Sequence, residues 1–198
     1  MIKKIVFDLG NVLFPLEYEE LHAWLETTHD GDHQVFRENF DRLYIDYEAG
    51  DFDTDAFFDI LRKELKMKFE DDVFKQKWVS LWKRDHEDVN DLLHELKKHH
   101  KLYILSNTNE IHMDEYFQTK PILGLFDHYF LSYQMHLAKP NPLIYNEVQN
   151  ALKVEASEII FFDDKKDNIE AALSVGWNAY LFTDADQVKK DLSSHNLI

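Results

Sequence analysis

Five short apolar runs, each followed by a polar residue, recur along the chain. Each has the length and the β-branched or aromatic side chains of a buried strand. They occupy residues 5–7, 102–105, 129–131, 159–162 and 179–182. Between the later runs, apolar residues recur three or four positions apart, which predicts amphipathic helices. These lie around residues 89–96, 144–152 and 169–173. Strands that alternate with helices predict an α/β fold with a parallel sheet.

Two of these helices carry their own boundary signals. Asn141 has the short polar side chain of an N-cap, and Pro142 suits the first helical position because that position needs no N–H. Gly176 follows the last helix, where a residue in the left-handed conformation often ends the helix. These signals fix where each helix should meet the neighbouring strands.

The stretch from residue 15 to 84 differs, because it has no clear strand pattern. Its amphipathic segments include residues 18–26, 35–47 and 54–66, with Gly50 between the last two. We predict an all-helical subdomain of residues 15–84, inserted into an α/β core of residues 1–14 and 85–198. Both ends of the insertion return near Asp8, so it is placed to close over the strand ends as a lid. A helical layer packed elsewhere on the domain is the alternative.

Polar side chains suited to phosphate chemistry follow the predicted strands or precede a helix. In open parallel sheets, ligands bind outside the carboxyl ends of the strands. Each residue alone is typical of a turn or a helix end. Their occurrence together, in this order, indicates one site. They are Asp8, Ser106 with Asn107, Lys139, and the pair Asp163 and Asp164.

The combination suits phosphoryl transfer. Asp8 can act as a nucleophile and form an aspartyl phosphate. A divalent cation between Asp8 and the paired aspartates would reduce their repulsion and orient the phosphate, and oxygen ligands favour Mg²⁺. Ser106 can hydrogen-bond one phosphate oxygen, and Lys139 can hold a second while restraining the acidic residues.

Composition and charge limit the class of protein further. The 198 residues are 44% hydrophobic, enough for one sizeable core. The absence of cysteine excludes thiol catalysis and zinc–thiolate sites. No stretch resembles a signal peptide or approaches the ~20 apolar residues of a membrane span, so we expect a cytoplasmic protein. The net charge of -16 disfavours nucleic-acid and membrane partners. The partner expected from the phosphoryl-transfer residues is a small phosphomonoester. The sequence does not fix the oligomeric state, and a monomer is slightly favoured.

On these residues the sequence resembles the haloacid dehalogenase (HAD) superfamily. Its four motifs match Phe-Asp-Leu-Gly-Asn-Val at residues 7–12, Leu-Ser-Asn-Thr at 105–108, Lys-Pro at 139–140, and Phe-Asp-Asp at 162–164 with Asn168. The insertion looks like the first type of HAD cap. The first motif and the run Tyr-Glu-Ala-Gly at 47–50 look like those of bacterial α-D-glucose-1-phosphate phosphatases. The resemblance implies a Rossmann-like sheet with the nucleophile strand at its centre.

The resemblance also implies a role for each candidate residue. Asp8 would be the nucleophile and a Mg²⁺ ligand, and the backbone carbonyl of Gly10 would be a second ligand. Asp164 would be the principal metal aspartate, with Asp163 beside it and acting directly or through water. The catalytic residues implied are Asp8, Ser106 and Lys139. The substrate-binding residues implied are Ser106, Asn107 and Lys139.

Gly10 departs from most of the superfamily, in which an aspartate at this position protonates the leaving group and then activates water. Such acid–base help is worth about 10²–10⁴-fold in rate. The loss need not abolish activity, because a sugar phosphate esterified at its anomeric carbon needs less protonation, and a water or a donor from the cap could also serve. The resemblance implies a small phosphorylated metabolite, with a sugar phosphate favoured, as the substrate. His112 and His136 lie nearest the motifs and are candidate replacement donors. The turn at residues 47–50 is a candidate substrate loop.

Two alternative functions stay open. A weak or inactive relative would use the phosphate pocket for sensing or partner binding. A metal-independent haloacid dehalogenase also lacks the second aspartate, because a halide leaves without protonation. The acidic pair Asp163 and Asp164 favours the phosphatase, since dehalogenases of this superfamily lack such a pair.

Overall fold

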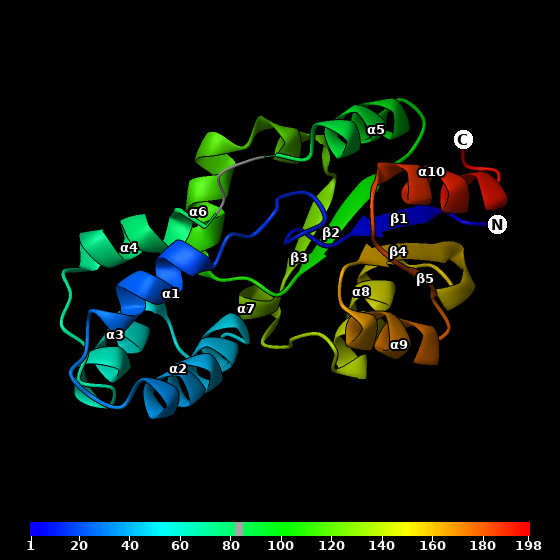
Figure 1. Cartoon of the computed structure of the whole chain (residues 1–198). Coiled ribbons are helices and arrows are strands. Elements are labelled where there is room, and N and C mark those ends of the chain that lie inside the picture. Colours follow the sequence, from blue (N-terminus) through cyan, green and yellow to red (C-terminus); the bar gives the residue numbers. More distant parts are fainter. Residues whose placement is uncertain (82–84) are drawn as a thin grey trace.

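The computed structural model describes residues 1–81 and 85–198, which form one parallel sheet of five strands (Figure 1). The strand order is β3–β2–β1–β4–β5, and every neighbouring pair is parallel. The strands are β1 (Lys4–Phe7), β2 (Leu102–Ser106), β3 (His128–Leu131), β4 (Ile159–Asp163) and β5 (Asn178–Leu181). The predicted α/β fold is therefore confirmed, and each predicted strand boundary is correct to within one residue.

The pairing of the central strand β1 with its neighbours aligns the ends of these strands at one edge of the sheet. Phe7, its last residue, is paired with Ile104 of β2 and with Phe162 of β4. The residues that follow these positions therefore emerge at the same edge. Asp8 lies in the middle of that edge, with Asp163 at the end of the adjacent strand.

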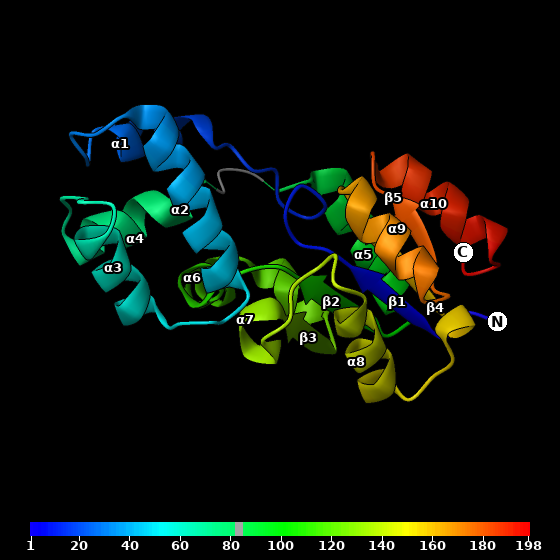
Figure 2. The same ribbon diagram turned by 90° about the horizontal axis from the view of Figure 1, so that it is seen from below.

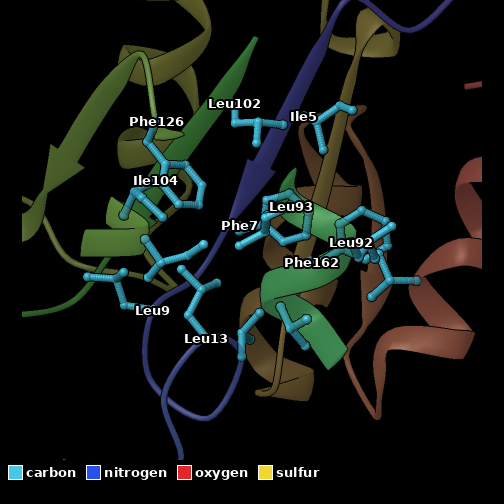
Figure 3. Packing of buried hydrophobic residues seen from close by; sticks show 14 of the residues in the cluster. Ile5, Phe7, Leu9, Leu13, Leu92, Leu93, Leu102, Ile104, Phe126 and Phe162 are labelled. Atoms are coloured by element: carbon cyan, nitrogen blue, oxygen red, sulfur yellow. The ribbon is translucent and has the colours of Figure 1, made fainter. Parts of the chain in front are cut away.

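Helices cover both faces of the sheet because alternate strand residues point to opposite sides. On one face, Phe7 and Phe162 stack with ring centroids 5.3 Å apart, and α5 packs its apolar stripe over them (Figure 3). On the other face, Val6 and Phe161 pack against α8 and α9. The helices of this layer structure are α5 (Glu87–Lys97), α6 (Glu110–Thr119), α7 (Ser132–Met135), α8 (Pro142–Leu152), α9 (Lys166–Ser174) and α10 (Ala185–Ser194).

The predicted helix boundaries hold at the atomic level. The Asn141 side chain accepts a hydrogen bond from the Leu143 N–H at 3.0 Å, as an N-cap does. Gly176 adopts a φ of +89° just after α9. Short 3₁₀ helices lie at Pro121–Leu125 and Ala156–Glu158. No helix in the described part of the chain is long and apolar enough to cross a lipid bilayer.

Four helices between β1 and α5 lie beside the sheet (Figures 1 and 2). Their buried side chains form a hydrophobic cluster separate from those on the two faces of the sheet. Phe57, Phe74 and Trp78 are buried at its centre. The described residues between β1 and α5 form helices and no strand, and the three expected helices are present, although the third is shorter than predicted. The helices are α1 (Glu19–Glu26), α2 (His33–Glu48), α3 (Thr54–Lys63) and α4 (Asp71–Val79).

The two connections between these helices and the sheet run side by side. The Glu17 N–H donates to the Leu81 carbonyl at 3.1 Å, and the His86 N–H donates to the Leu13 carbonyl at 3.2 Å. The helical insertion (α1–α4) thus joins the core at the sheet edge that carries Asp8. The subdomain boundaries at residues 14/15 and 84/85 stay a prediction, and residues 82–84 of the second boundary lie outside the described residues.

Candidate active site

Asp8 lies directly after β1, and the sheet fixes its backbone. Its N–H donates to the Phe162 carbonyl at 2.9 Å, and the residue is only 6% exposed. Burial raises the pKa of the Asp8 carboxyl to about 6, because a charged carboxylate is poorly solvated there. The cation of Lys139 opposes this shift, and the negative charge of Asp163 adds to it.

Lys139 holds the acidic residues together. Its Nζ lies 2.9 Å from Asp8 Oδ1 and 2.6 Å from Asp163 Oδ2, and it donates to the Leu105 carbonyl at 2.9 Å. An ammonium group has three N–H donors, so these contacts account for all of them. Burial alone lowers the pKa of Lys139, but Asp163 and Asp8 outweigh it and raise the pKa overall. The lysine therefore carries a positive charge at the centre of the site.

Asn107 positions this lysine. Its side-chain Nδ2 donates to the Lys139 carbonyl and its Oδ1 accepts from the Lys139 N–H, both at 2.8 Å. Ser106 is buried at the end of β2, where its hydroxyl donates to the Asn107 carbonyl at 3.3 Å. The structure thus brings Ser106 and Asn107 to the expected sheet edge. It also uses the Asn107 side chain to fix the backbone of Lys139.

The two neighbouring aspartates have different surroundings. Asp163 is fully buried and accepts hydrogen bonds from Lys139, from Asn168 Nδ2 at 2.9 Å and from the Lys165 N–H at 2.8 Å. Asp164 is half-buried, and its Oδ2 accepts from Asn11 Nδ2 at 2.9 Å. Asp164 is therefore the more open of the two carboxylates.

These carboxylates form a group with the spacing of a metal site. Asp8, Asp163 and Asp164 each place one oxygen within 4.8 Å of the others. Mg²⁺ prefers hard oxygen ligands, and carboxylates supply them. The donor set of this structure therefore fits magnesium.

A small cavity of about 70 Å³ opens beside these residues. Gly10, Asp164 and Lys139 line it from the core, and Tyr44 and Glu48 line it from α2 of the helical insertion. Residues of α2 and Asp8 therefore line the same cavity, and the role of the insertion as a lid stays a prediction. The other lining residues are Asp8, Asn11, Leu16, Tyr18, Leu81, Asn107, Thr108, His112, Lys165 and Asn168.

Several residues of the site have roles that sequence reasoning did not assign. Asn11 has a φ of +56° and orients Asp164, while Asn168 orients Asp163. Thr108 lines the cavity, and its buried hydroxyl has no hydrogen-bond partner among the described residues. Glu48 belongs to the run at residues 47–50 suggested as a substrate loop, but it is the last residue of α2, and no pattern marked its side chain as lining the cavity that contains Asp8.

The two histidines considered as proton donors are poorly suited to that role. His112 lines the cavity, but burial lowers its pKa to about 3, so its ring is neutral. His136 is exposed, and its Nδ1 lies 2.9 Å from the Gly50 carbonyl rather than along the cavity. The source of the proton must be sought elsewhere in the site.

The Asn168 side chain offers a test of the metal site. Asn168→Ala removes the amide that holds both oxygens of Asp163, so Mg²⁺ affinity is expected to fall by about 10–100-fold. Calorimetric titration with Mg²⁺ measures this. Asn146→Ala, at an exposed position of α8, is the matched control and should bind Mg²⁺ as the unmodified protein does. Equal Mg²⁺ affinity of Asn168→Ala and Asn146→Ala would contradict the assignment of a metal site that includes Asp163.

Comparison with known proteins agrees with this geometry. A family model described as haloacid dehalogenase-like hydrolase matches residues 2–176. The chain belongs to this family. This chain is 28% identical over 192 residues to D-ribitol-5-phosphate phosphatase of Bacteroides thetaiotaomicron, and the match covers 91% of each chain.

Solved structures extend the likeness to the whole fold. A HAD family enzyme of Bacteroides thetaiotaomicron in complex with magnesium and inorganic phosphate has a TM-score of 0.79 and 26% identity, covering 93% of this chain and 96% of that one. A predicted HAD-like hydrolase of Porphyromonas gingivalis has a TM-score of 0.84 and 24% identity, covering 99% and 98%. The predicted superfamily, fold and enzyme class, a HAD-like phosphomonoesterase, are confirmed. The finer likeness to α-D-glucose-1-phosphate phosphatases is not confirmed.

Proposed function

We propose that this HAD-like hydrolase removes phosphate from a small sugar or polyol phosphate in two steps. The Asp8 carboxylate attacks phosphorus, the ester P–O bond breaks, and an aspartyl phosphate forms as the alcohol leaves. Water then attacks the aspartyl phosphate, which releases inorganic phosphate and restores Asp8. The observation that carries the proposal is the Asp8 carboxylate at the centre of the sheet edge, 2.9 Å from the Lys139 ammonium and inside an acidic cluster.

The metal ligands in this proposal are Asp8, the backbone carbonyl of Gly10 and Asp164. Asp163 takes part directly or through water. Its oxygens already accept hydrogen bonds from Lys139 and other neighbours. Bound Mg²⁺ supplies positive charge that offsets the phosphoryl oxygens and the carboxylates. This positive charge also reduces the repulsion expected between an anionic substrate and a protein of net charge -16.

The phosphate-binding groups in this proposal are Ser106, Asn107 and Lys139. Lys139 can reach a phosphate oxygen when Asp8 turns from its ion pair toward phosphorus, because one N–H is then released. Thr108 adds a hydroxyl that lines the same cavity. The site can thus surround a transferred phosphoryl group with donors.

The small cavity and the helical insertion favour a small substrate. The insertion contributes Tyr18, Tyr44 and Glu48, whose polar atoms suit the hydroxyls of a sugar or polyol. The similarity to a D-ribitol-5-phosphate phosphatase supports a polyol phosphate, and the first-motif resemblance supports an anomeric sugar phosphate. Phosphate on a folded protein or a nucleic acid does not fit beneath the insertion.

Phosphate release from a panel of esters tests this function. We expect Mg²⁺-dependent release from D-ribitol 5-phosphate or α-D-glucose 1-phosphate, loss of release with a chelator, and none from a phosphopeptide. Halide release from 2-chloropropionate, measured in parallel without Mg²⁺, tests the dehalogenase alternative. Halide release, or binding of the phosphate esters without turnover, would contradict the proposal.

A further inference from the structure

We propose that Glu48 of the helical insertion is the proton donor and acceptor that Gly10 cannot be. This inference rests on the proposed phosphatase function. As Asp8 attacks and the ester P–O bond breaks, Glu48 gives its proton to the departing alcohol oxygen. In the second step, Glu48 takes a proton from the water whose oxygen bonds to phosphorus, and the bond between Asp8 and phosphorus breaks.

Among the described residues that line the cavity, Glu48 is the proton-bearing group that remains after the other side chains are considered. Asp163 and Asp8 raise the pKa of Lys139, so the ammonium keeps its proton, and His112 is neutral. Burial raises the pKa of Tyr44 and of Tyr18 far above the neutral range. Asp164 lies in the carboxylate cluster that fits the metal, and the Lys165 side chain is exposed to solvent.

The Glu48 carboxyl is oriented by its own helix. Tyr44 lies one turn earlier on α2, and its hydroxyl donates to Glu48 Oε1. Among the described residues no other hydrogen bond reaches this carboxyl, so none of them competes with a substrate for Oε2. Both Tyr44 and Glu48 line the cavity that contains Asp8.

Contacts with the core fix the end of α2. The Gly50 carbonyl lies 2.9 Å from His136 Nδ1, and Gly50 itself has a φ of +79° and packs on the backbone of Tyr133, where a Cβ atom would collide. Tyr47, next to Glu48, bonds through its hydroxyl to Thr54 Oγ1 at 2.8 Å, and the Thr54 hydroxyl donates in turn to Glu110 Oε2 of the core at 2.8 Å. Figure 2 shows α2 reaching toward α7, the helix that carries Tyr133. The contacts of Gly50 and Tyr47 therefore fix the position of Glu48 near the sheet edge.

The surroundings of Glu48 keep part of its population protonated at neutral pH. Burial raises its pKa to about 7; Asp8 adds to this shift, and the Tyr44 hydrogen bond, Lys165 and Lys139 oppose it. A group that titrates near the working pH is effective both as an acid and as a base. The titratable and charged groups around Glu48 are Tyr44 on α2, Tyr18 before α1, Tyr116 on α6, and Asp8, Lys139, Asp164 and Lys165 at the sheet edge.

The test compares two esters that differ in their need for a proton. For Glu48→Gln, kcat/KM on D-ribitol 5-phosphate is expected to fall by about 10²–10⁴-fold, because an alkoxide is a poor leaving group. On 4-nitrophenyl phosphate, whose leaving group needs no proton, kcat/KM should stay within about threefold of the unmodified enzyme. That retained activity also shows that the variant is folded.

The pH profile and two further variants sharpen the test. Glu48 must be protonated to act as the acid, so kcat/KM on the alkyl ester should fall as pH rises above about 7, and Glu48→Gln should lose this limb. Glu48→Asp should recover part of the activity. Asp41→Asn, an exposed carboxylate on the same helix and outside the cavity, should behave as the unmodified enzyme.

Each other outcome has a definite meaning. An equal loss on both esters would show that Glu48 acts in binding or positioning, which overturns the proton-transfer role. Unchanged activity of Glu48→Gln on both esters would overturn it as well. If the unmodified enzyme and Asp41→Asn hydrolyse neither ester, the proposed phosphatase function fails first, and the two failures are thereby distinguished.

Discussion

Replacing Asp8 with asparagine is expected to abolish phosphate release, with a fall in kcat of at least about 10⁴-fold. An amide keeps the shape of the side chain but is a poor nucleophile and carries no negative charge for a metal ion. The fold should survive, since burial already disfavours the charged form of Asp8 and a neutral side chain avoids that cost. Phosphate release with Mg²⁺, together with thermal unfolding, measures both effects.

The control for this variant is Asp114→Asn on α6. Asp114 is exposed and lies outside the cavity, so its variant should keep full activity. Turnover by Asp8→Asn within tenfold of the unmodified enzyme would rule out Asp8 as the nucleophile.

Replacing Lys139 with methionine is expected to cost about 3–5 kcal/mol of unfolding free energy as well as activity. The lysine is 5% exposed and pairs with two buried carboxylates, Asp8 and Asp163. Without it, two buried negative charges face each other. Mg²⁺ should restore part of the lost stability, since a bound cation supplies the missing positive charge. Urea unfolding with and without Mg²⁺ measures both.

Lys166→Met is the matched control, because Lys166 forms an exposed ion pair with Glu170 at 3.3 Å. Exposed pairs of this kind contribute little, so the unfolding free energy should change by less than about 1 kcal/mol. If Lys139→Met were as stable as Lys166→Met, the lysine would not be holding the acidic residues together.

The sheet was predictable because its three inner strands, β2, β1 and β4, are buried on both faces. Such strands appear as continuous apolar runs, and those around Val6 and Phe161 have no competing helical pattern. Helix α5 was predictable because one stripe of leucines faces the sheet. Helices α4 and α6 were not singled out, since short segments and a buried polar residue such as His112 obscure the apolar period.

The candidate site was predictable where it depends on the sheet alone. Parallel strands end at one edge, so the pattern places Asp8 and Asp163 at that edge. The central position of the strand before Asp8, and the approach of Lys139, were implied by the family resemblance and not by the strand pattern. The contribution of α2 depends instead on how the insertion docks, which long-range contacts such as Gly50 with Tyr133 decide. No local pattern encodes that contact, so the approach of Glu48 to the cavity became visible only in three dimensions.

The most direct test is a search for the covalent intermediate on Asp8. The enzyme is mixed with Mg²⁺ and its best ester, quenched in acid within one turnover, and digested for mass spectrometry. We predict one added phosphoryl group on the peptide that carries Asp8, formed and lost at rates that match turnover and absent from Asp8→Asn. Full phosphate release with no phosphorylated peptide at any time would mean that water attacks the substrate directly.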